Sequence, residues 1–370
     1  MVKGDIRVIL AGGGTGGHVF PAIYIAQYLK KNWGAHCRFI GTKKGIENIK
    51  VSQAGFVVKY IWISGFKRGL HVSNLLFPLK LIVSLLQSRK ELMNFKPDLV
   101  IGTGGYVSGP VLYQAIKMKI LTAIQEQNSY PGITTRILAS KVDRVFLAYA
   151  EALNFLKNVK KYVLVGNPIQ NNIKSDNKEE ARKYFDLKIN VPTVLVFGGS
   201  QGARSINQTI DAILNQGIFK NVQLLWQTGK TSFESYREKY KSFTGNGLHI
   251  LPFIDRMDLA YTIADFAICR AGAMTISELA AAGVPAILVP LPHAAENHQL
   301  KNAQTVAQGG GAYVIEEKSG MEEVLKSVIN KLINSPDTLR EMGKNISRFH
   351  RPNTTQLIAV ELKKLLEEKL

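Results

Sequence analysis

At residues 6–18 the chain reads IRVILAGGGTGGH, a short apolar run followed at once by a glycine-rich turn. Glycine accepts positive φ angles and carries no Cβ, so successive backbone N–H groups in such a turn can converge on a phosphate. Two more turns of this kind, at residues 102–106 and 198–203, also follow apolar runs. The first and third turns occupy equivalent places in the two halves of the chain. The sequence therefore predicts two similar nucleotide-binding folds that face each other across a cleft.

The spacing of apolar runs outward from these turns predicts an α/β fold with two doubly wound domains. A chain of 370 residues is longer than one hydrophobic core usually fills. Short strand-like runs alternate with helical patterns in both halves, which is typical of parallel sheets with crossover helices. The expected strands are residues 7–10, 35–40, 99–101, 121–124, 145–148 and 161–168, then 194–197, 223–227, 249–251, 266–269, 286–289 and 311–315.

A polar, charged run after residue 168 marks the expected junction between the domains. We expect an N-terminal domain at 1–165, a C-terminal domain at 166–350, and a final segment at 351–370. Apolar residues in that segment recur at helical spacing between charged ones, so it is expected to form an amphipathic helix that packs back on the N-terminal domain.

Charge is concentrated in the first quarter of the chain. The net charge is +19, and residues 1–90 hold 14 Lys or Arg against Asp5 and Glu47. Within this region basic and apolar residues lie close together, as on proteins that dock on an anionic membrane surface. The candidates for a membrane-facing surface are Trp62, Lys67, Arg68, Leu75, Leu76, Leu79 and Lys80. The alternative is an ordinary core helix with solvated lysines.

Other classes of partner and location fit the composition less well. No recognised nucleic-acid-binding motif accompanies the positive charge, so we expect no nucleic-acid partner. No apolar run approaches the roughly 20 residues that span a bilayer, and no signal-peptide pattern precedes the first strand. The sequence therefore predicts a protein that stays in the cytoplasm.

The first glycine turn leaves a nicotinamide enzyme open as an alternative. Gly12, Gly14 and Gly17 satisfy the dinucleotide fingerprint, which also needs an acidic residue near the end of the second strand. No Asp or Glu occurs in residues 6–46, which argues against NAD but leaves NADP possible. A non-catalytic protein that binds membrane surfaces or polyanions is a third reading, based on charge alone.

Two residues near the ends of expected first-half strands are candidates for catalysis. His18 closes the first glycine turn at a helix N-terminus, where the dipole favours a neutral imidazole that can accept a proton. Glu126 lies in the polar run 125–128 directly after a strand, at the sheet edge where α/β proteins bind ligands. The alternatives are a structural histidine and a solvated loop.

The second half offers a nucleotide site at residues 267–278, where a strand, a small-residue turn and a helix start follow in order. Glu278 is suited to accept both ribose hydroxyls with its two carboxylate oxygens. Alternatively, Thr275 and Glu278 form a capping box. A polar set between His293 and Asn302 follows the next strand, and its His and Glu spacing matches no zinc motif. We expect no metal there and favour sugar or phosphate recognition by amides.

Taken together, these motifs resemble the MurG family of glycosyltransferases over nearly the whole chain. The resemblance rests on residues 11–21, 102–110, 126–128, 166–168, 198–204, 270–285 and 299–303. It implies a GT-B fold whose second domain holds a UDP-sugar and whose first domain holds a lipid-linked acceptor. It also implies an inverting reaction that uses no metal or other cofactor.

The resemblance further implies a reaction, a location and a set of contact residues. GlcNAc would pass from UDP-GlcNAc to the C4 hydroxyl of undecaprenyl-diphosphate-MurNAc-pentapeptide (lipid I), forming a β1→4 link and lipid II for peptidoglycan. The enzyme would sit peripherally on the cytoplasmic face of the cell membrane, against its anionic inner leaflet. His18 and Glu126 are the catalytic candidates, and one expected contact, Gln170, stands where some members carry Arg. The expected substrate contacts are Thr15, Gly16, Gly17, Tyr106, Asn128, Gln170, Ser200, Gln201, Gly202, Ile254, Ala273, Met274, Thr275, Ile276, Ser277, Glu278, Gln299 and Asn302.

Overall fold

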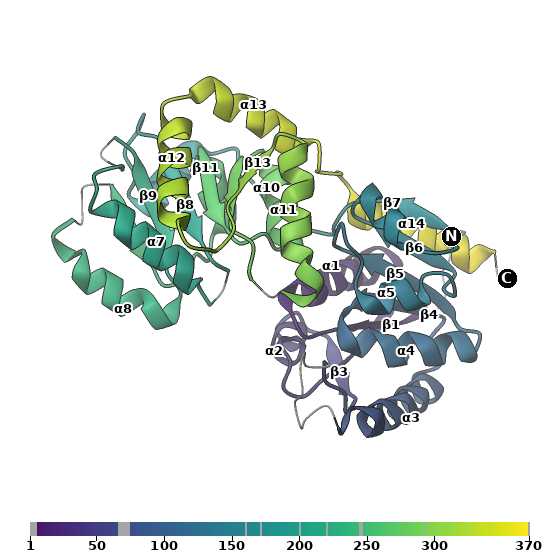
Figure 1. Cartoon of the computed structure of the whole chain (residues 1–370). Helices are drawn as coiled ribbons and strands as arrows, with labels where there is room; N and C mark the ends of the chain where they lie inside the picture. Colours follow the sequence, from purple (N-terminus) through teal and green to yellow (C-terminus); the bar gives the residue numbers. More distant parts are fainter. Residues whose placement is uncertain are drawn as a thin grey trace. The chain divides into compact units, whose positions relative to one another are not determined.

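The structure is a computed structural model that describes residues 6–65, 75–159, 161–170, 172–199, 201–219, 221–243, 247–292 and 294–368. The chain divides into two compact units (Figure 1). Unit 1 comprises Met1–Ile169 together with Arg351–Leu370, and unit 2 comprises Gln170–His350. The chain thus changes unit a few residues after the expected position 165, and its last segment belongs to unit 1.

Unit 1 is built on a parallel sheet in which the described strands follow the order β3-β2-β1-β4-β5-β6-β7. The first strand lies inside the sheet, with Leu10 opposite Phe39 of β2 and Ile101 of β4. The strands are β1 (Arg7–Gly12), β2 (His36–Gly41), β3 (Val57–Tyr60), β4 (Leu99–Gly104), β5 (Leu121–Glu126), β6 (Arg144–Leu147) and β7 (Tyr162–Leu164). The helices are α1 (Gly16–Trp33), α2 (Ile46–Gln53), α3 (Phe77–Phe95), α4 (Gly105–Lys117), α5 (Ile133–Leu138), the 3-10 helix η2 (Ala150–Phe155) and α14 (Thr354–Glu367).

Unit 2 repeats this arrangement, with its described strands in the order β10-β9-β8-β11-β12-β13. All pairs in both sheets are parallel, as the prediction of two doubly wound domains requires. The strands are β8 (Thr193–Phe197), β9 (Gln223–Gln227), β10 (Leu248–Leu251), β11 (Phe266–Cys269), β12 (Ala286–Leu288) and β13 (Ala312–Val314). The helices are α6 (Lys178–Phe185), α7 (Arg204–Leu214), α8 (Lys230–Lys239), η3 (Lys241–Phe243), α9 (Met257–Ile263), α10 (Ala273–Ala282), η4 (Ala295–Asn297), α11 (His298–Gln308), α12 (Met321–Ile333) and α13 (Pro336–Ser347).

The central strands are continuous apolar runs because both faces of each sheet are covered. In β1, Val8 and Leu10 enter one core, whereas Ile9 enters the core on the opposite face. All three side chains are fully buried. This burial explains why the strands next to the glycine turns could be located from sequence.

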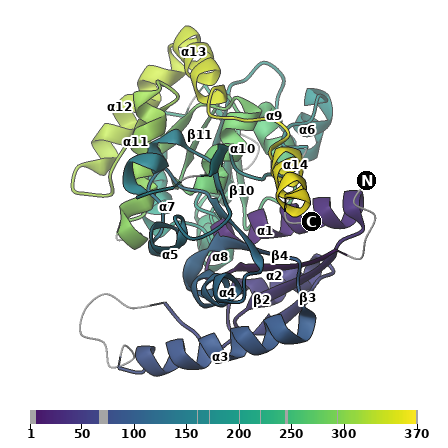
Figure 2. The ribbon, with the colours of Figure 1, turned by 90° about the vertical axis from the view of Figure 1, so that its right-hand side faces the viewer.

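The C-terminal helix α14 completes the core of unit 1. Its side chains Ile358, Leu362 and Leu365 are buried in the same cluster as Val8 and Leu10. The helix packs against α1, as Figure 2 shows. A segment about 180 residues beyond the rest of unit 1 in sequence therefore forms part of its core.

Helix α3 exposes many of its apolar residues, although Leu92 is buried and Phe77 and Phe95 pack against the core. It lies next to α4 at the edge of unit 1 (Figure 2), and its buried residues are Ser84, Ser88 and Leu92. Leu86 is 63% exposed, and Leu75, just before the helix, is 78% exposed. The exposed apolar residues are therefore not part of the core of unit 1, and a membrane-facing surface stays a prediction. Among the described residues, no helix is both long and apolar enough to cross a membrane.

Candidate functional site

In unit 1 the candidate residues gather at the carboxyl ends of three neighbouring strands. The first glycine turn follows β1, the second ends β4, and the polar run ends β5. Gly12 of β1 is paired directly with Gly104 of β4. The structure thereby brings one group of predicted residues to the same sheet edge: Thr15, Gly16, Gly17, His18, Tyr106, Glu126 and Asn128.

The imidazole of His18 lies against the second glycine turn. A Cβ on Gly104 would stand 2.6 Å from His18 Nδ1, and a Cβ on Gly105 would stand 3.3 Å from His18 Cδ2. Both glycines also have positive φ angles, of 102° and 75°. Beneath them, Thr103 Oγ1 donates a 2.7 Å hydrogen bond to the His18 carbonyl oxygen. Glycine is therefore needed at position 104 because the histidine ring packs on its backbone, and at position 105 because a Cβ would first meet the Gly13 carbonyl oxygen.

The Glu126 carboxylate accepts hydrogen bonds from the residues that follow it in the chain. The side chain is 3% exposed, and its Oε1 accepts hydrogen bonds of 3.0 Å from both the backbone N–H and the side-chain amide of Asn128. Its Oε2 accepts from Thr135 Oγ1 at 2.6 Å and from Gly132 N–H at 3.2 Å. Of the two catalytic candidates, Glu126 therefore has both carboxylate oxygens engaged by residues of the segment that follows it.

A buried acid that the sequence analysis did not select holds the first glycine turn. Glu47 is 1% exposed, and its Oε2 accepts a 3.2 Å hydrogen bond from Gly14 N–H. Its Oε1 accepts from Thr42 N–H at 2.9 Å and from Thr42 Oγ1 at 2.7 Å. On the other side, a Cβ on Gly14 would lie 2.9 Å from the ring of Tyr106. The N–H of Gly14 is therefore already bound to a side-chain carboxyl group of the same chain, that of Glu47.

Tyr106 shares this environment. Burial raises the pKa of its phenol, a hydrogen bond with Thr42 lowers it, and the charge of Glu47 raises it again. The only signal for Glu47 in the sequence is that it is the first acidic residue after the glycine turn.

In unit 2 the third glycine turn and the small-residue turn start from neighbouring strands. The turn after β8 has positive φ at Gly199 and Gly202, and Gly202 N–H donates a 2.9 Å hydrogen bond to the Gly199 carbonyl oxygen. Strand β11, which pairs with β8, leads into α10 through Gly272. Two helix N-termini, of α7 and α10, therefore begin at the same sheet edge. Gln201 is exposed there, and the predicted contact Ser200 lies outside the described residues.

Glu278 does not form the capping box considered above. Helix α10 has Gly272 at its N-cap and begins at Ala273, so Thr275 lies inside the helix. The Glu278 Oε2 instead accepts a 2.9 Å hydrogen bond from the hydroxyl of Tyr261 on α9. Burial raises the pKa of Glu278 to about 7, although the hydrogen bond from Tyr261 opposes this rise.

Hydrogen bonds through Gln227 connect Ile254 to the third glycine turn in unit 2. Ile254 is 1% exposed, and its N–H donates a 2.9 Å hydrogen bond to Gln227 Oε1. The Gln227 Nε2 donates to the Gly199 carbonyl oxygen at 2.8 Å. Gln227, which was not selected from sequence, thus connects Ile254 to the third glycine turn. A backbone contact from Ile254 to a base would use its carbonyl oxygen or displace Gln227.

The remaining unit 2 candidates are spread over three segments. Gln299 lies in the first turn of α11, where its Oε1 accepts from Leu291 N–H at 2.9 Å, and Asn302 is fully buried one turn later. Ser277 Oγ donates to the Ala273 carbonyl oxygen at 2.9 Å and so supports the start of α10. Gln170 is exposed at the first position of unit 2. His293, Lys67 and Arg68 lie outside the described residues.

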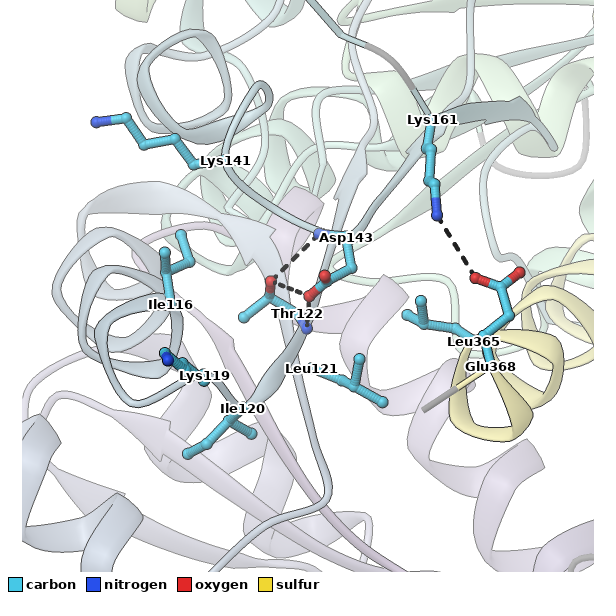
Figure 3. Close-up of a pocket in the computed structure, with 10 residues that line it drawn as sticks. All are labelled: Ile116, Lys119, Ile120, Leu121, Thr122, Lys141, Asp143, Lys161, Leu365 and Glu368. Atoms are coloured by element: carbon cyan, nitrogen blue, oxygen red, sulfur yellow. Dashed lines mark hydrogen bonds and ion pairs between the residues drawn. The ribbon is translucent and has the colours of Figure 1, made fainter. Parts of the chain in front are cut away.

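A separate pocket of about 430 Å³ lies at the amino ends of β5 and β6 in unit 1 (Figure 3). Within it, Lys161 pairs with Glu368 at 3.5 Å, and Thr122 Oγ1 donates to Asp143 at 2.9 Å. None of the predicted site residues lines this pocket, which opens at the opposite end of the strands from the glycine turns. Its lining residues are Ile116, Lys119, Ile120, Leu121, Thr122, Lys141, Asp143, Lys161, Leu365 and Glu368.

Comparison with known proteins identifies the class. Residues 8–147 match the glycosyltransferase family 28 N-terminal domain, and residues 193–358 match the glycosyltransferase family 28 C-terminal domain. The two parallel-sheet units are those of a GT-B glycosyltransferase. This class excludes the NADP oxidoreductase and the non-catalytic protein considered from sequence.

Full-length relatives define the family more closely. The chain is 44% identical over 98% of both chains to a Flavobacterium psychrophilum protein named "UDP-N-acetylglucosamine--N-acetylmuramyl-(pentapeptide) pyrophosphoryl-undecaprenol N-acetylglucosamine transferase". An Acetivibrio thermocellus protein of the same name is 39% identical, with 98% of this chain and 99% of that protein covered. The crystal structure of Acinetobacter baumannii MurG superimposes with a TM-score of 0.79 at 30% identity, covering 97% of this chain and 99% of the other. The chain belongs to the MurG family.

Proposed function

We propose that this protein transfers GlcNAc from UDP-GlcNAc to the C4 hydroxyl of MurNAc in lipid I, forming the β1→4 link of lipid II in peptidoglycan synthesis. The observation that carries the proposal is the full-length identity, at 39–44%, to proteins named for this reaction. The candidate residues at the carboxyl ends of both sheets support it, because α/β proteins bind ligands at that edge.

Unit 2 holds the donor in this proposal. The N–H groups of the third glycine turn, apart from that of Gly202, and those of the α10 N-terminus stabilise the diphosphate, as helix dipoles favour anions there. Glu278 accepts the ribose hydroxyls, and the backbone of Ile254 meets the uracil. The GlcNAc contacts come from Gln299 and Asn302.

Unit 1 holds the acceptor and the base. The C4 hydroxyl oxygen attacks the anomeric carbon of GlcNAc while the bond from that carbon to the UDP oxygen breaks, so the configuration inverts. His18 takes the hydroxyl proton, and Thr15, Gly16, Gly17, Tyr106 and Asn128 line the acceptor side. Backbone N–H groups stabilise the leaving diphosphate. No step in this scheme uses a metal or another cofactor.

The surface of α3 docks the enzyme peripherally on the cytoplasmic face of the cell membrane. Trp62, Leu76 and Leu79 are 45%, 50% and 50% exposed. Lys80 lies 6.0 Å from the centre of the Trp62 ring and donates to Ser64 Oγ at 3.0 Å. Exposed apolar side chains with adjacent cations suit an anionic leaflet, where a lipid-linked acceptor resides.

The test is transfer of radiolabelled GlcNAc from UDP-GlcNAc to a lipid I analogue in EDTA. Wild type is expected to label the lipid, Glu278→Ala to lose most of the transfer, and Glu323→Ala, at an exposed position on α12, to keep it. A folded wild-type protein that transfers no label and is not stabilised by UDP would contradict the proposal.

A further inference from the structure

Three buried amide side chains lie beneath His18. Gln125 ends β5 together with Glu126, Gln127 follows, and Asn167 comes after β7. These side chains are only 0%, 1% and 5% exposed. Gln127 Oε1 lies 2.9 Å from His18 Nδ1. The amides therefore determine which hydrogen-bonding role His18 Nδ1 can take.

A backbone carbonyl fixes the orientation of Gln127. Its Nε2 donates a 2.8 Å hydrogen bond to the carbonyl oxygen of Gln125 and also donates to the Gln125 Oε1. Both partners are oxygens that can only accept. Turning the amide over would set oxygen against oxygen in a buried place and leave both groups without a hydrogen bond. Gln127 Oε1 must therefore face His18.

A second backbone carbonyl fixes the other two amides. Asn167 Nδ2 donates to the Gln127 carbonyl oxygen at 3.0 Å, so its Oδ1 points the other way. That Oδ1 accepts a 3.0 Å hydrogen bond from Gln125 Nε2, which leaves Gln125 Oε1 to accept from Gln127. The orientation of each amide agrees with those of the other two.

We propose that Gln127, supported by Gln125 and Asn167, is a positioning residue that holds His18 in the tautomer protonated at Nδ1. An amide oxygen only accepts, so His18 Nδ1 must donate and carry the proton. In the neutral imidazole the lone pair then lies on Nε2. Resting on the proposed function, this assigns His18 Nε2 as the atom that takes the proton of the acceptor hydroxyl.

The arrangement also suits the reaction itself. When the hydroxyl oxygen bonds to the anomeric carbon and the bond to UDP breaks, the hydroxyl proton moves to Nε2. His18 then becomes an imidazolium whose Nδ1–H still donates to Gln127 Oε1. The amides need no rearrangement between the two states, and the packing of Gly104 and Gly105 keeps the ring in place.

The direct test is ¹⁵N NMR of full-length protein labelled at histidine, with the His18 signals identified by their loss in His18→Asn. In the neutral form of the His18 imidazole, we expect a protonated Nδ1 and an unprotonated Nε2. In Gln127→Met we expect the Nε2-protonated tautomer to appear and kcat to fall at least tenfold, because general-base catalysis contributes about 10²–10⁴-fold. The KM for UDP-GlcNAc is expected to stay unchanged.

The matched control is Gln223→Met in unit 2. Gln223 is 1% exposed, and its Nε2 donates to the carbonyl oxygens of Lys188 and Val191 at 3.1 and 3.2 Å. The substitution removes a similar buried amide but leaves the His18 tautomer and kcat as in wild type. Two results would overturn the proposal. The first is a neutral His18 in the wild-type protein that carries its proton on Nε2. The second is a His18 tautomer in Gln127→Met that is the same as in wild type. Retained transfer in His18→Asn would instead refute the proposed role of His18, whatever its tautomer.

Discussion

At the scale of single residues, the proposed contact of the Glu278 carboxylate with the donor ribose predicts that donor binding depends on pH. Burial raises the pKa of Glu278 to about 7, so the ionised form proposed to accept the two ribose hydroxyls predominates only above that pH. The phosphates of UDP-GlcNAc stay ionised throughout the range from pH 5.5 to 8. We expect the affinity of the protein for UDP-GlcNAc, measured by calorimetry, to fall about tenfold per pH unit below pH 7 and to stay constant above pH 7. Glu278→Gln is expected to abolish this slope, and an unchanged slope in that variant would assign the titration to another group.

The hydroxyl of Tyr261 also affects the pKa of the Glu278 carboxylate. This hydroxyl donates to Glu278 Oε2 and so lowers the pKa of Glu278. Removing a hydrogen bond worth about 1 kcal/mol is equivalent to about 0.7 pH unit. In Tyr261→Phe, the midpoint of the pH dependence of UDP-GlcNAc binding is therefore expected to rise by about that amount. Tyr184→Phe, at a position 54% exposed on α6, serves as control, and a midpoint that moves equally in both variants would contradict the assignment.

The site residues that could be selected from sequence are those whose position follows from the residues next to them in the chain. Gly104 ends β4, Gly202 lies in the turn after β8, and Glu278 lies on α10, the helix that follows β11, so their place near the sheet edge follows from the pattern around them. The roles of Glu47 and Gln127 do not follow from such a local pattern, although Gln127 lies in the polar run 125–128. Each acts by hydrogen bonds to a segment brought near by the fold, Gly14 in one case and His18 in the other.

At the scale of elements, α3 supports a quantitative prediction about membrane binding. Arg89 and Lys90 are exposed on the helix that also exposes Leu79 and Leu86. Each basic residue near an anionic surface contributes about 1 kcal/mol, so Arg89→Ala combined with Lys90→Ala is expected to weaken binding to phosphatidylglycerol vesicles about 30-fold. Vesicle sedimentation at low and high salt measures this effect.

The matched control for α3 is the double replacement of Lys178 and Lys183 by Ala on α6 in unit 2, where both side chains are exposed. It removes the same charge and is expected to leave vesicle binding nearly unchanged. Equal losses in the two double variants would mean that net charge alone, rather than the α3 surface, drives binding.

The central strands were predictable from their apolar runs, and so were the edge strands β7, β10 and β13, whereas the edge strand β3 was not. The expected strands at 223–227 and 266–269 agree with β9 and β11, because their apolar runs are continuous. Strand β3 lies at an edge of its sheet, with Val57 58% exposed, and carries too weak a pattern to be selected. For α3, the apolar pattern predicted a helix but left its buried face open, and that face turned out to be the one with Ser84 and Ser88.

At the scale of the whole molecule, the chain leaves unit 1 after Ile169 and returns to it at Arg351, so the stability of unit 1 depends on its last helix. Leu362 of α14 is fully buried in the core of unit 1, whereas Leu357 on the same helix is 43% exposed. Replacing a buried leucine by alanine usually destabilises a protein by about 2–5 kcal/mol. Leu362→Ala is therefore expected to lower the free energy of unfolding of unit 1 by that amount, and Leu357→Ala is expected to lower it by much less. Calorimetry with and without UDP separates the units, because UDP stabilises only the unit that binds it. A Leu362→Ala protein in which the UDP-sensitive transition falls instead would show that α14 stabilises the donor-binding unit.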